Sequence, residues 1–220
     1  MTSNVEKHAS NPLAANEYLG PLLELLGDHG ISAAQVVQGT LIHPNALIAV
    51  DTRITVSDYD RIIRNALALS HDPLLGLEHG RRMSIASHGF LGFAVMASET
   101  LGEGLSLAVR YAGTRTNLAE IRFIQGNHHC VLQVLRTASL PASFHFIAHN
   151  ILSTMITIAR FLTRNSEKLT PEIHLIEPPQ APLSYYDQLL DCPVTFNCEH
   201  YELVLPKEAL NLEVSTANSV

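Results

Sequence analysis

The segment 71–111, HDPLLGLEHGRRMSIASHGFLGFAVMASETLGEGLSLAVRY, has glycines at positions 76, 80, 89 and 92, ahead of its last helical stretch. Each glycine inside a helix costs roughly 1 kcal/mol relative to alanine, so these four cannot all belong to one long helix. The segment is therefore predicted to be rich in turns, with a short polar piece between Gly76 and Gly80 and an apolar step between Gly89 and Gly92. A compact core element and a ligand-contacting loop both fit this pattern.

Hydrophobic periodicity, capping residues and helix-breaking residues predict helices on both sides of these turns. They span residues 18–26, 32–37, 57–72, 100–111, 141–164 and 185–190. Ser57 and Thr100 are the expected N-caps of two of these helices, because an acidic residue follows each of them three positions later. Residues 40–55 contain Pro44 and scattered aliphatic residues, and we expect an irregular connection there.

Strands are predicted where apolar and polar residues alternate. They span residues 119–125, 129–136, 170–177, 194–196 and 201–205. The turn at 126–128 makes the first two an antiparallel hairpin, and a short polar turn at 197–200 joins the last two as a second antiparallel pair. The expected fold class is α+β, with a mostly antiparallel sheet of about five strands covered by helices and an N-terminal helical portion.

Three regions are expected along the chain. Residues 1–16 are polar and form a flexible N-terminal tail, because they contain no strong apolar anchor. Residues 17–210 form one folded domain, which agrees with a length of 220 residues. Residues 211–220 are mostly small and polar, which is typical of a linker.

The composition narrows the class of protein. Hydrophobic residues make up 46% of the chain and charged residues 16%, which is typical of a globular protein with a large core. A net charge of −7 argues against nucleic-acid binding by this chain alone, because phosphate is bound by clustered Lys and Arg. The three cysteines are too few for a disulfide framework, and no signal peptide is recognisable. A cytoplasmic location is therefore expected.

The helix expected at 141–164 resembles a membrane span in its apolar character. It also contains His145, His149, Asn150 and Arg160, and ionisable groups at bilayer depth are costly. We therefore expect a helix buried inside the domain, without membrane contact.

The sequence contains no recognised catalytic or nucleotide-binding motif, such as a nucleophile elbow, an HExxH helix or a P-loop. His145 and His149 lie four residues apart on one helix face, but no third metal ligand is specified. Cys192, Cys198 and His200 do not have the spacing of a zinc knuckle. No catalytic residue, metal ligand or cofactor is therefore assigned.

Two blocks of sequence resemble a known family. The blocks are DPLLGLEHG…SHGFLGFAVMASETLGEGLSLAVRY and YYDQLLDCPVTFNCEHYELVLPKEAL. They occur in the order found in the N-terminal, arabinose-binding-like effector domain of AraC/XylS-type transcriptional regulators. The resemblance implies a helix-turn-helix half that follows this domain and makes the DNA contacts, and it implies a homodimer.

An effector domain needs a mainly apolar pocket with a few convergent polar groups. The long helix supplies that mixture, and the turn near residue 88 and the end of the helix at 111 are expected to close the pocket from the other side. The predicted ligand-binding residues are His88, Arg110, Tyr111, His145, Phe146, His149 and Arg160.

The expected function is therefore ligand sensing, in which a small organic effector controls a separate helix-turn-helix domain. The chain has no Trp, and its apolar helix fits fatty, aromatic or amino-acid-derived effectors at least as well as a sugar. Two alternatives stay open. One is a dimerisation module without a ligand, and the other is a small hydrolase or isomerase.

Overall fold

The computed structural model describes residues 12–13, 18–48, 54–114, 118–137, 143–164 and 166–215. Over these residues the chain has an α+β fold with a five-stranded sheet, as the sequence predicts. The predicted tail lies mostly outside the described residues, as does the second half of the predicted linker. The described parts are β1 (Pro12–Leu13), which pairs with β2 (Ile54–Thr55), and the first part of the predicted linker, 211–215.

The sheet is mostly antiparallel, with strand order β3-β4-β7-β5-β6. Its strands are β3 (Ala119–Gln125), β4 (His129–Arg136), β5 (Glu172–His174), β6 (Val194–Thr195) and β7 (Tyr201–Pro206). The hairpin of β3 and β4 has the predicted ends, and β5 and β6 form the one parallel pair among these strands. The predicted pairing of the last two strands is wrong. β5 lies between β6 and β7, so the turn at 197–200 carries the chain past β5.

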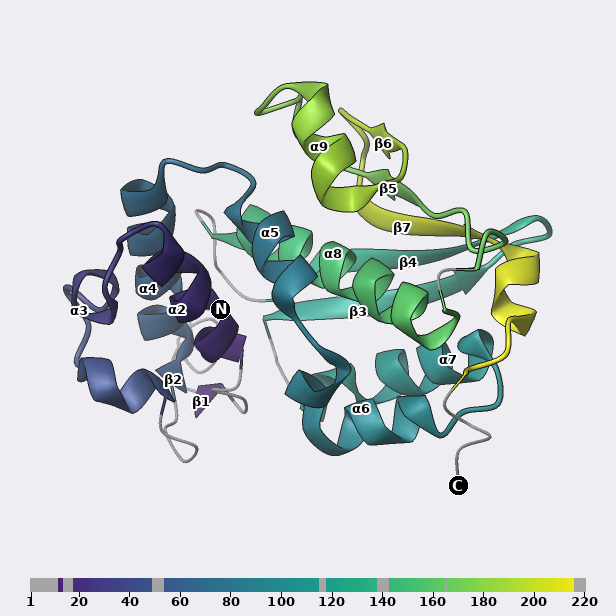
Figure 1. The fold of residues 1–220 in the computed structure, drawn as a ribbon, viewed down its shortest axis with the longest axis horizontal. Helices are drawn as coiled ribbons and strands as arrows, with labels where there is room; N and C mark the ends of the chain where they lie inside the picture. The colour runs from purple at the N-terminus through teal and green to yellow at the C-terminus, as the bar shows by residue number, and fades with distance from the viewer. Residues whose placement is uncertain are drawn as a thin grey trace, which may run out of the picture.

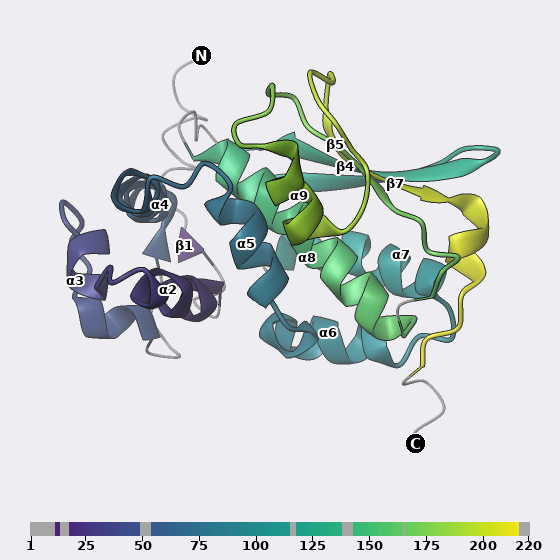
Figure 2. The same ribbon diagram turned by 45° about the horizontal axis from the view of Figure 1, so that its top comes forward.

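Helices cover one face of this sheet (Figures 1 and 2). They are α5 (Leu75–Arg82), α6 (Gly89–Met96), α7 (Leu101–Tyr111), α8 (Phe144–Leu162) and α9 (Leu183–Leu190). α8 lies across the sheet, with α5 packed along one side of it and α6 and α7 on the other side, toward β3. The alternation along β7 explains this layering, because Tyr201, Leu203 and Leu205 are buried while Glu202 and Val204 face the other side.

The N-terminal helical portion forms its own group of helices beside α5 (Figure 1). It contains α2 (Leu19–Asp28), α3 (Ala33–Val36), a 3₁₀ turn (Pro44–Ile48) and α4 (Val56–Ser70). The predicted cap of α4 is off by two residues. The Thr55 hydroxyl, and not Ser57, accepts a hydrogen bond from the Asp58 backbone N–H at 3.1 Å. The other predicted cap is confirmed, since the Thr100 hydroxyl accepts a hydrogen bond from the Glu103 N–H.

Gly76 and Gly80 do not form turns, which corrects the prediction for this segment. Both lie inside α5, where the chain packs directly against α8. A methyl group at Gly76 would lie 2.5 Å from the Phe146 carbonyl oxygen, and one at Gly80 would lie 2.6 Å from the Asn150 carbonyl oxygen. The glycines therefore allow two helix backbones to touch, and the packing gained there outweighs their cost in helix propensity.

The second pair of glycines behaves closer to the prediction. Gly89 has a φ of +55° and joins a 3₁₀ turn (Ile85–His88) to α6, a backbone conformation that other residues rarely adopt. Gly92 lies inside α6, where its backbone approaches the carbonyl of Ile85 too closely for a side chain. The apolar step between them is thus the first turn of a helix.

The last described residues run beside the start of α7. Leu101 donates a backbone hydrogen bond to Leu212 at 2.8 Å, and Val214 donates one to Glu99 at 3.0 Å. The first part of the predicted linker is therefore paired with the folded domain. Over the described residues, the helices are too short or too polar to cross a bilayer.

Candidate functional site

A cavity of about 150 Å³ lies between α6, α7, α8 and the start of β3. Its apolar lining includes Ile85, Leu91, Val95, Leu101, Leu105, Ala108, Val109, Leu118, Ile121, Ile147, Ile151, Met155, Ile158 and Leu162. At helical spacing, the sequence predicts one apolar face on the long helix, formed by Phe144, Ile147, Ile151, Met155, Ile158 and Leu162. All of these except Phe144 belong to the cavity lining. That face therefore forms a wall of the cavity, while other residues of α8 contact α5 and the sheet.

One end of the cavity is polar. The polar lining residues are Tyr18, Tyr59, His88, Asn150 and Thr154. Tyr18 and Tyr59 come from the N-terminal helices and the others from the 3₁₀ turn before α6 and from α8, so this end lies where the N-terminal helices meet the rest of the domain. None of the lining residues that the structure describes is Asp, Glu, Lys or Arg.

Hydrogen bonds connect three of these residues, Tyr18, Asn150 and His88, and a buried histidine of α5 links the first two. His79 Nε2 lies 3.0 Å from the Tyr18 carbonyl oxygen, and Asn150 Nδ2 lies 3.0 Å from His79 Nδ1. Because a carbonyl only accepts, Nε2 carries the proton of the imidazole and Nδ1 accepts from the Asn150 amide. The Tyr18 hydroxyl in turn lies 3.1 Å from His88 Nδ1.

His79 is held in its neutral form. Its side chain is buried and stacks on Phe146, with ring centroids 5.6 Å apart. Burial lowers the pKa of His79 to about 4, because an imidazolium would lose its hydration there. Near neutral pH the chain Asn150–His79–Tyr18 is therefore an uncharged link between α8, α5 and the start of α2.

The predicted ligand-binding residues fall into separate places. His88 lines the cavity, but the other six lie outside its lining. Arg110 and Tyr111 are exposed at the end of α7, and Phe146 is buried against His79. Contact with a ligand stays a prediction for all seven residues, and the structure does not bring the seven together around one space.

The Arg160 side chain forms hydrogen bonds with the backbone at the end of α9. Its guanidinium donates to the carbonyl oxygens of Leu190 at 2.7 Å and Asp191 at 2.6 Å. These carbonyls end α9, where a positive charge is favourable to the helix dipole. Arg160 therefore fastens α9 to α8.

His145 and His149 belong to a second polar cluster, between α8 and the sheet. His149 Nε2 pairs with the Glu177 carboxylate, which also accepts a hydrogen bond from the Tyr201 hydroxyl at 2.7 Å. Burial alone would raise the pKa of Glu177, but the bonds from His149 and Tyr201 lower it below its usual value. Burial and the neighbouring His149 lower the pKa of His145. This cluster fixes α8 to β7 and to the segment after β5.

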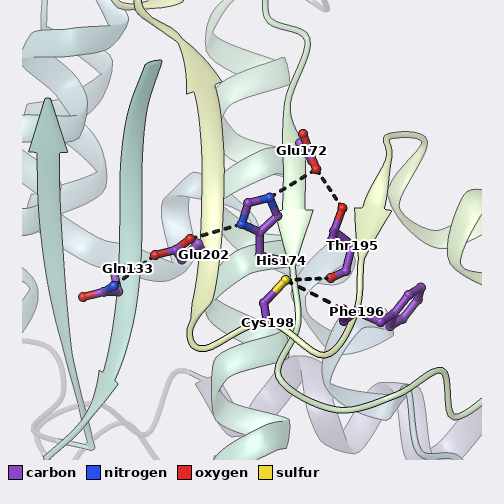
Figure 3. A network of polar contacts seen from close by, with 7 residues as sticks. All are labelled: Gln133, Glu172, His174, Thr195, Phe196, Cys198 and Glu202. Atoms are coloured by element: carbon purple, nitrogen blue, oxygen red, sulfur yellow. Dashed lines mark hydrogen bonds and ion pairs between the residues drawn. The ribbon is translucent and has the colours of Figure 1, made fainter. Parts of the chain in front are cut away.

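A third network lies on the sheet face opposite α8 (Figure 3). His174 Nδ1 lies 3.1 Å from the Glu202 carboxylate, and its Nε2 lies 3.1 Å from the Glu172 carboxylate. Gln133 bonds the other oxygen of Glu202, and Thr195 bonds Glu172. The network therefore runs across β4, β7, β5 and β6. Over the described residues, no three His, Cys, Asp or Glu side chains are arranged to hold a metal ion.

Sequence reasoning missed most of the cavity lining. It used Asn150 only as a residue that interrupts the apolar helix, and it gave Tyr18 and Tyr59 no role beyond their helices. The signal in the sequence was the apolar face of 141–164, which predicted the wall but not what it encloses. Tyr18 lies 70 residues before its partner His88, so local spacing could not join them.

Comparison with known proteins agrees with the fold. The family model described as "Arabinose-binding domain of AraC transcription regulator, N-term" matches residues 30–214. The ornithine utilization regulator of Pseudomonas aeruginosa is 27% identical over 202 residues, which are 91% of this chain and 59% of that protein. An uncharacterized HTH-type transcriptional regulator of Mycobacterium tuberculosis is 30% identical over 155 residues, which are 69% of this chain and 45% of that protein.

A solved structure shows the same fold. The crystal structure of the transcriptional regulator CdpR from Pseudomonas aeruginosa matches 92% of this chain and 59% of its own, with a TM-score of 0.66 at 20% identity. The chain thus spans about half of each of these relatives. Because the family model covers most of its length, the chain belongs to the family of arabinose-binding N-terminal domains of AraC transcription regulators.

Proposed function

We propose that this chain is the effector-binding domain of an AraC-type transcription regulator, and that the effector occupies the cavity between α6, α7, α8 and β3. The observation that carries the proposal is the cavity itself, which is apolar with a polar end built from the two parts of the domain. Ligand sites have this composition, in which apolar surface supplies affinity and a few polar groups fix orientation.

The rest of the proposal concerns the parent protein. The Mycobacterium tuberculosis relative is an HTH-type regulator, and both it and the ornithine utilization regulator are about twice as long as the matched region. DNA contact is therefore assigned to a separate helix-turn-helix domain. With a net charge of −7, this chain itself has little means of binding phosphate. We assign the parent regulator to the cytoplasm, because the DNA that it would bind is found there. No catalytic role is proposed.

The name of a relative does not identify the effector of this chain. One relative is named for ornithine utilization, and ornithine carries two ammonium groups and a carboxylate at neutral pH. The described cavity lining has no Asp, Glu, Lys or Arg side chain to neutralise those charges. We therefore do not assign ornithine to this chain.

The test is thermal unfolding of the purified chain against a panel of metabolites. An effector at 100 times its Kd stabilises by about 2.7 kcal/mol, which raises the Tm by roughly 5–10 °C for a domain of this size. Ala108→Leu, which fills part of the cavity, should remove the response. Ala94→Leu makes the same change at an exposed site on α6 and should keep it. A response that persists in Ala108→Leu would place the effector elsewhere.

Self-association is a second candidate function. α6 exposes Phe90 and Phe93, which are 92% and 61% accessible, on the side away from the cavity. A homodimer through this half would cover them. Light scattering coupled to size exclusion distinguishes the two candidates, since a dimerisation module without a ligand shows a dimer and no thermal response to any metabolite.

A further inference from the structure

We infer that the cavity takes a small, uncharged, mainly apolar molecule with a single hydroxyl or carbonyl group, whose polar end meets Tyr18 and His88. This inference rests on the effector-binding role proposed above and narrows it to a chemical class. Three features of the cavity carry it, namely its charge, its size and the position of its polar groups.

The first feature is the lack of fixed charge. None of the described lining residues is acidic, Lys or Arg, and most are aliphatic. A buried ion that finds no partner loses its hydration without compensation. His88 is the lining residue able to carry a positive charge, and its Nδ1 already lies within hydrogen-bond distance of the Tyr18 hydroxyl. A neutral ligand therefore fits this lining better than an anion, a cation or a zwitterion.

The second feature is size. The cavity holds about 150 Å³. An apolar cavity of roughly this volume in another protein binds benzene. One six-membered ring with one or two further heavy atoms is thus about what the enclosed space accepts.

The third feature is the polar end. A hydroxyl group has one donor and two acceptor positions, so the Tyr18 hydroxyl can bond both His88 and a ligand. The carbonyl of the same residue accepts from His79, which in turn is bonded to Asn150 of α8. A ligand hydrogen bond at Tyr18 would therefore act on the N-cap residue of α2, which connects this helix to α5 and α8. This gives the ligand a means of changing how the N-terminal helices sit on the domain.

The experiment is a calorimetric titration of the chain with four single-ring probes: phenol, toluene, benzoate and benzylammonium. Phenol should bind about 2- to 10-fold more tightly than toluene, the gain of one net hydrogen bond. Benzoate and benzylammonium should bind at least about 100-fold more weakly than phenol. Ala108→Leu should abolish binding of phenol and toluene, and Ala94→Leu should not.

Tyr18→Phe tests the polar end separately. It removes the hydroxyl but keeps the ring, so phenol should lose its advantage over toluene while toluene binds as before. An unchanged phenol preference in Tyr18→Phe would overturn the assignment of the polar end.

Other outcomes separate the inference from the proposed function. If benzoate or benzylammonium binds more tightly than phenol and Ala108→Leu removes that binding, the inference is wrong while the cavity remains the effector site. If no neutral probe binds, the inference is also wrong, and the metabolite panel alone decides the proposed function. Equal binding of phenol to the wild type and Ala108→Leu would show that the probe sits outside the cavity.

Discussion

The two sides of α8 are packed in opposite ways. Toward α5 the helix backbones touch at Gly76 and Gly80, and Ser153 of α8 donates a hydrogen bond to the Leu77 carbonyl at 2.7 Å. Toward α6 and α7 the same helix presents large aliphatic side chains that leave about 150 Å³ unfilled. Small residues and hydroxyl groups thus pack α8 against α5 without a cavity. The branched side chains on the other face of α8 leave a cavity between this helix, α6 and α7.

The two faces of α8 therefore have different roles. The contact with α5, together with the pairing of His149 and Glu177, fixes the position of α8 against the rest of the domain. The opposite face can then line a cavity while the position of α8 in the domain stays fixed. Pre-formed pockets on a rigid frame favour binding, because less order has to be created when the ligand arrives.

The largest effect is expected from Gly80→Ala, which tests the tight side. The added methyl group would lie 2.6 Å from both the Asn150 carbonyl oxygen and Ser153 Cβ, so α5 and α8 must separate. We expect the free energy of unfolding to fall by about 3 kcal/mol, even though alanine is the better helix former. Urea denaturation measures this change.

Gly20→Ala in α2 is the matched control for Gly80→Ala. Nothing lies within 4 Å of the position of its added methyl group. The same substitution should therefore stabilise the protein, by up to about 1 kcal/mol. Two changes of the same sign and size would contradict the backbone contact between α5 and α8.

A pH-dependent loss of stability is expected next, from His79 at the polar end of the cavity. Its pKa is about 4 in the folded protein and 6.5 in the unfolded chain, so the unfolded chain binds the extra proton between these values. The stability from neutral His79 is complete above pH 6.5 and is lost as the pH falls toward 4. Between pH 7.5 and 4.5 we expect a loss of about 2.5 kcal/mol from this residue.

The comparison with His79→Gln isolates this effect, because burial also lowers the pKa of His145 and adds to the same trend. Glu177 acts in a more acidic range, since its lowered pKa places its loss of stability below the usual carboxylate value of 4.5. Urea denaturation at several pH values should show a flatter profile for His79→Gln between pH 7.5 and 4.5. Parallel profiles would mean that His79 is not held neutral by burial.

Arg160→Met should have a smaller effect, of about 1–2 kcal/mol. It removes two charge-assisted hydrogen bonds to carbonyls at the end of α9 while keeping most of the aliphatic stem. Arg110→Met, at an exposed position, should change stability by less than about 0.5 kcal/mol. Thermal response to an effector should survive Arg160→Met. Its disappearance would return Arg160 to the ligand site that the sequence predicted.

Local patterns predicted much of the fold. The hairpin 119–136 was predicted to the residue, because strict alternation and a turn sequence are both local signals. The long helix was also found, and its predicted end near Arg164 is two residues beyond the observed end at Leu162. The position of β5 between β6 and β7 could not be predicted, because it depends on pairing between segments that no local pattern links.

The same limit applies to Gly76 and to the cavity. Helix propensity correctly gave a cost for Gly76, but the compensating contact with Phe146 comes from a segment 70 residues further along the chain. For the cavity, the sequence predicted which face of α8 is apolar and selected His88. The sequence also predicted His149 and Arg160 as ligand-binding residues, because they are polar residues within an apolar helix. Such residues also occur where a helix meets a partner, and both of them turn out to hold neighbouring elements.

The smallest effect is expected from Ala108→Leu, and its pairing with Ala148→Leu compares loose and tight packing most directly. Ala108 lines the cavity, and Ala148 is fully buried on α8 outside it. Ala108→Leu places three carbon atoms in unfilled space and should raise the free energy of unfolding by about 1 kcal/mol. Ala148→Leu makes the same change where no space is left, and should lower it by about 1–3 kcal/mol. Both variants make the same substitution within a helix, so the change in helix propensity is the same for both. The difference between their free energies of unfolding therefore reports the space available at each site. Urea denaturation of the pair decides the question, since a loss of similar size at both positions would mean that α6 and α7 close onto α8 in solution and leave no room for an effector.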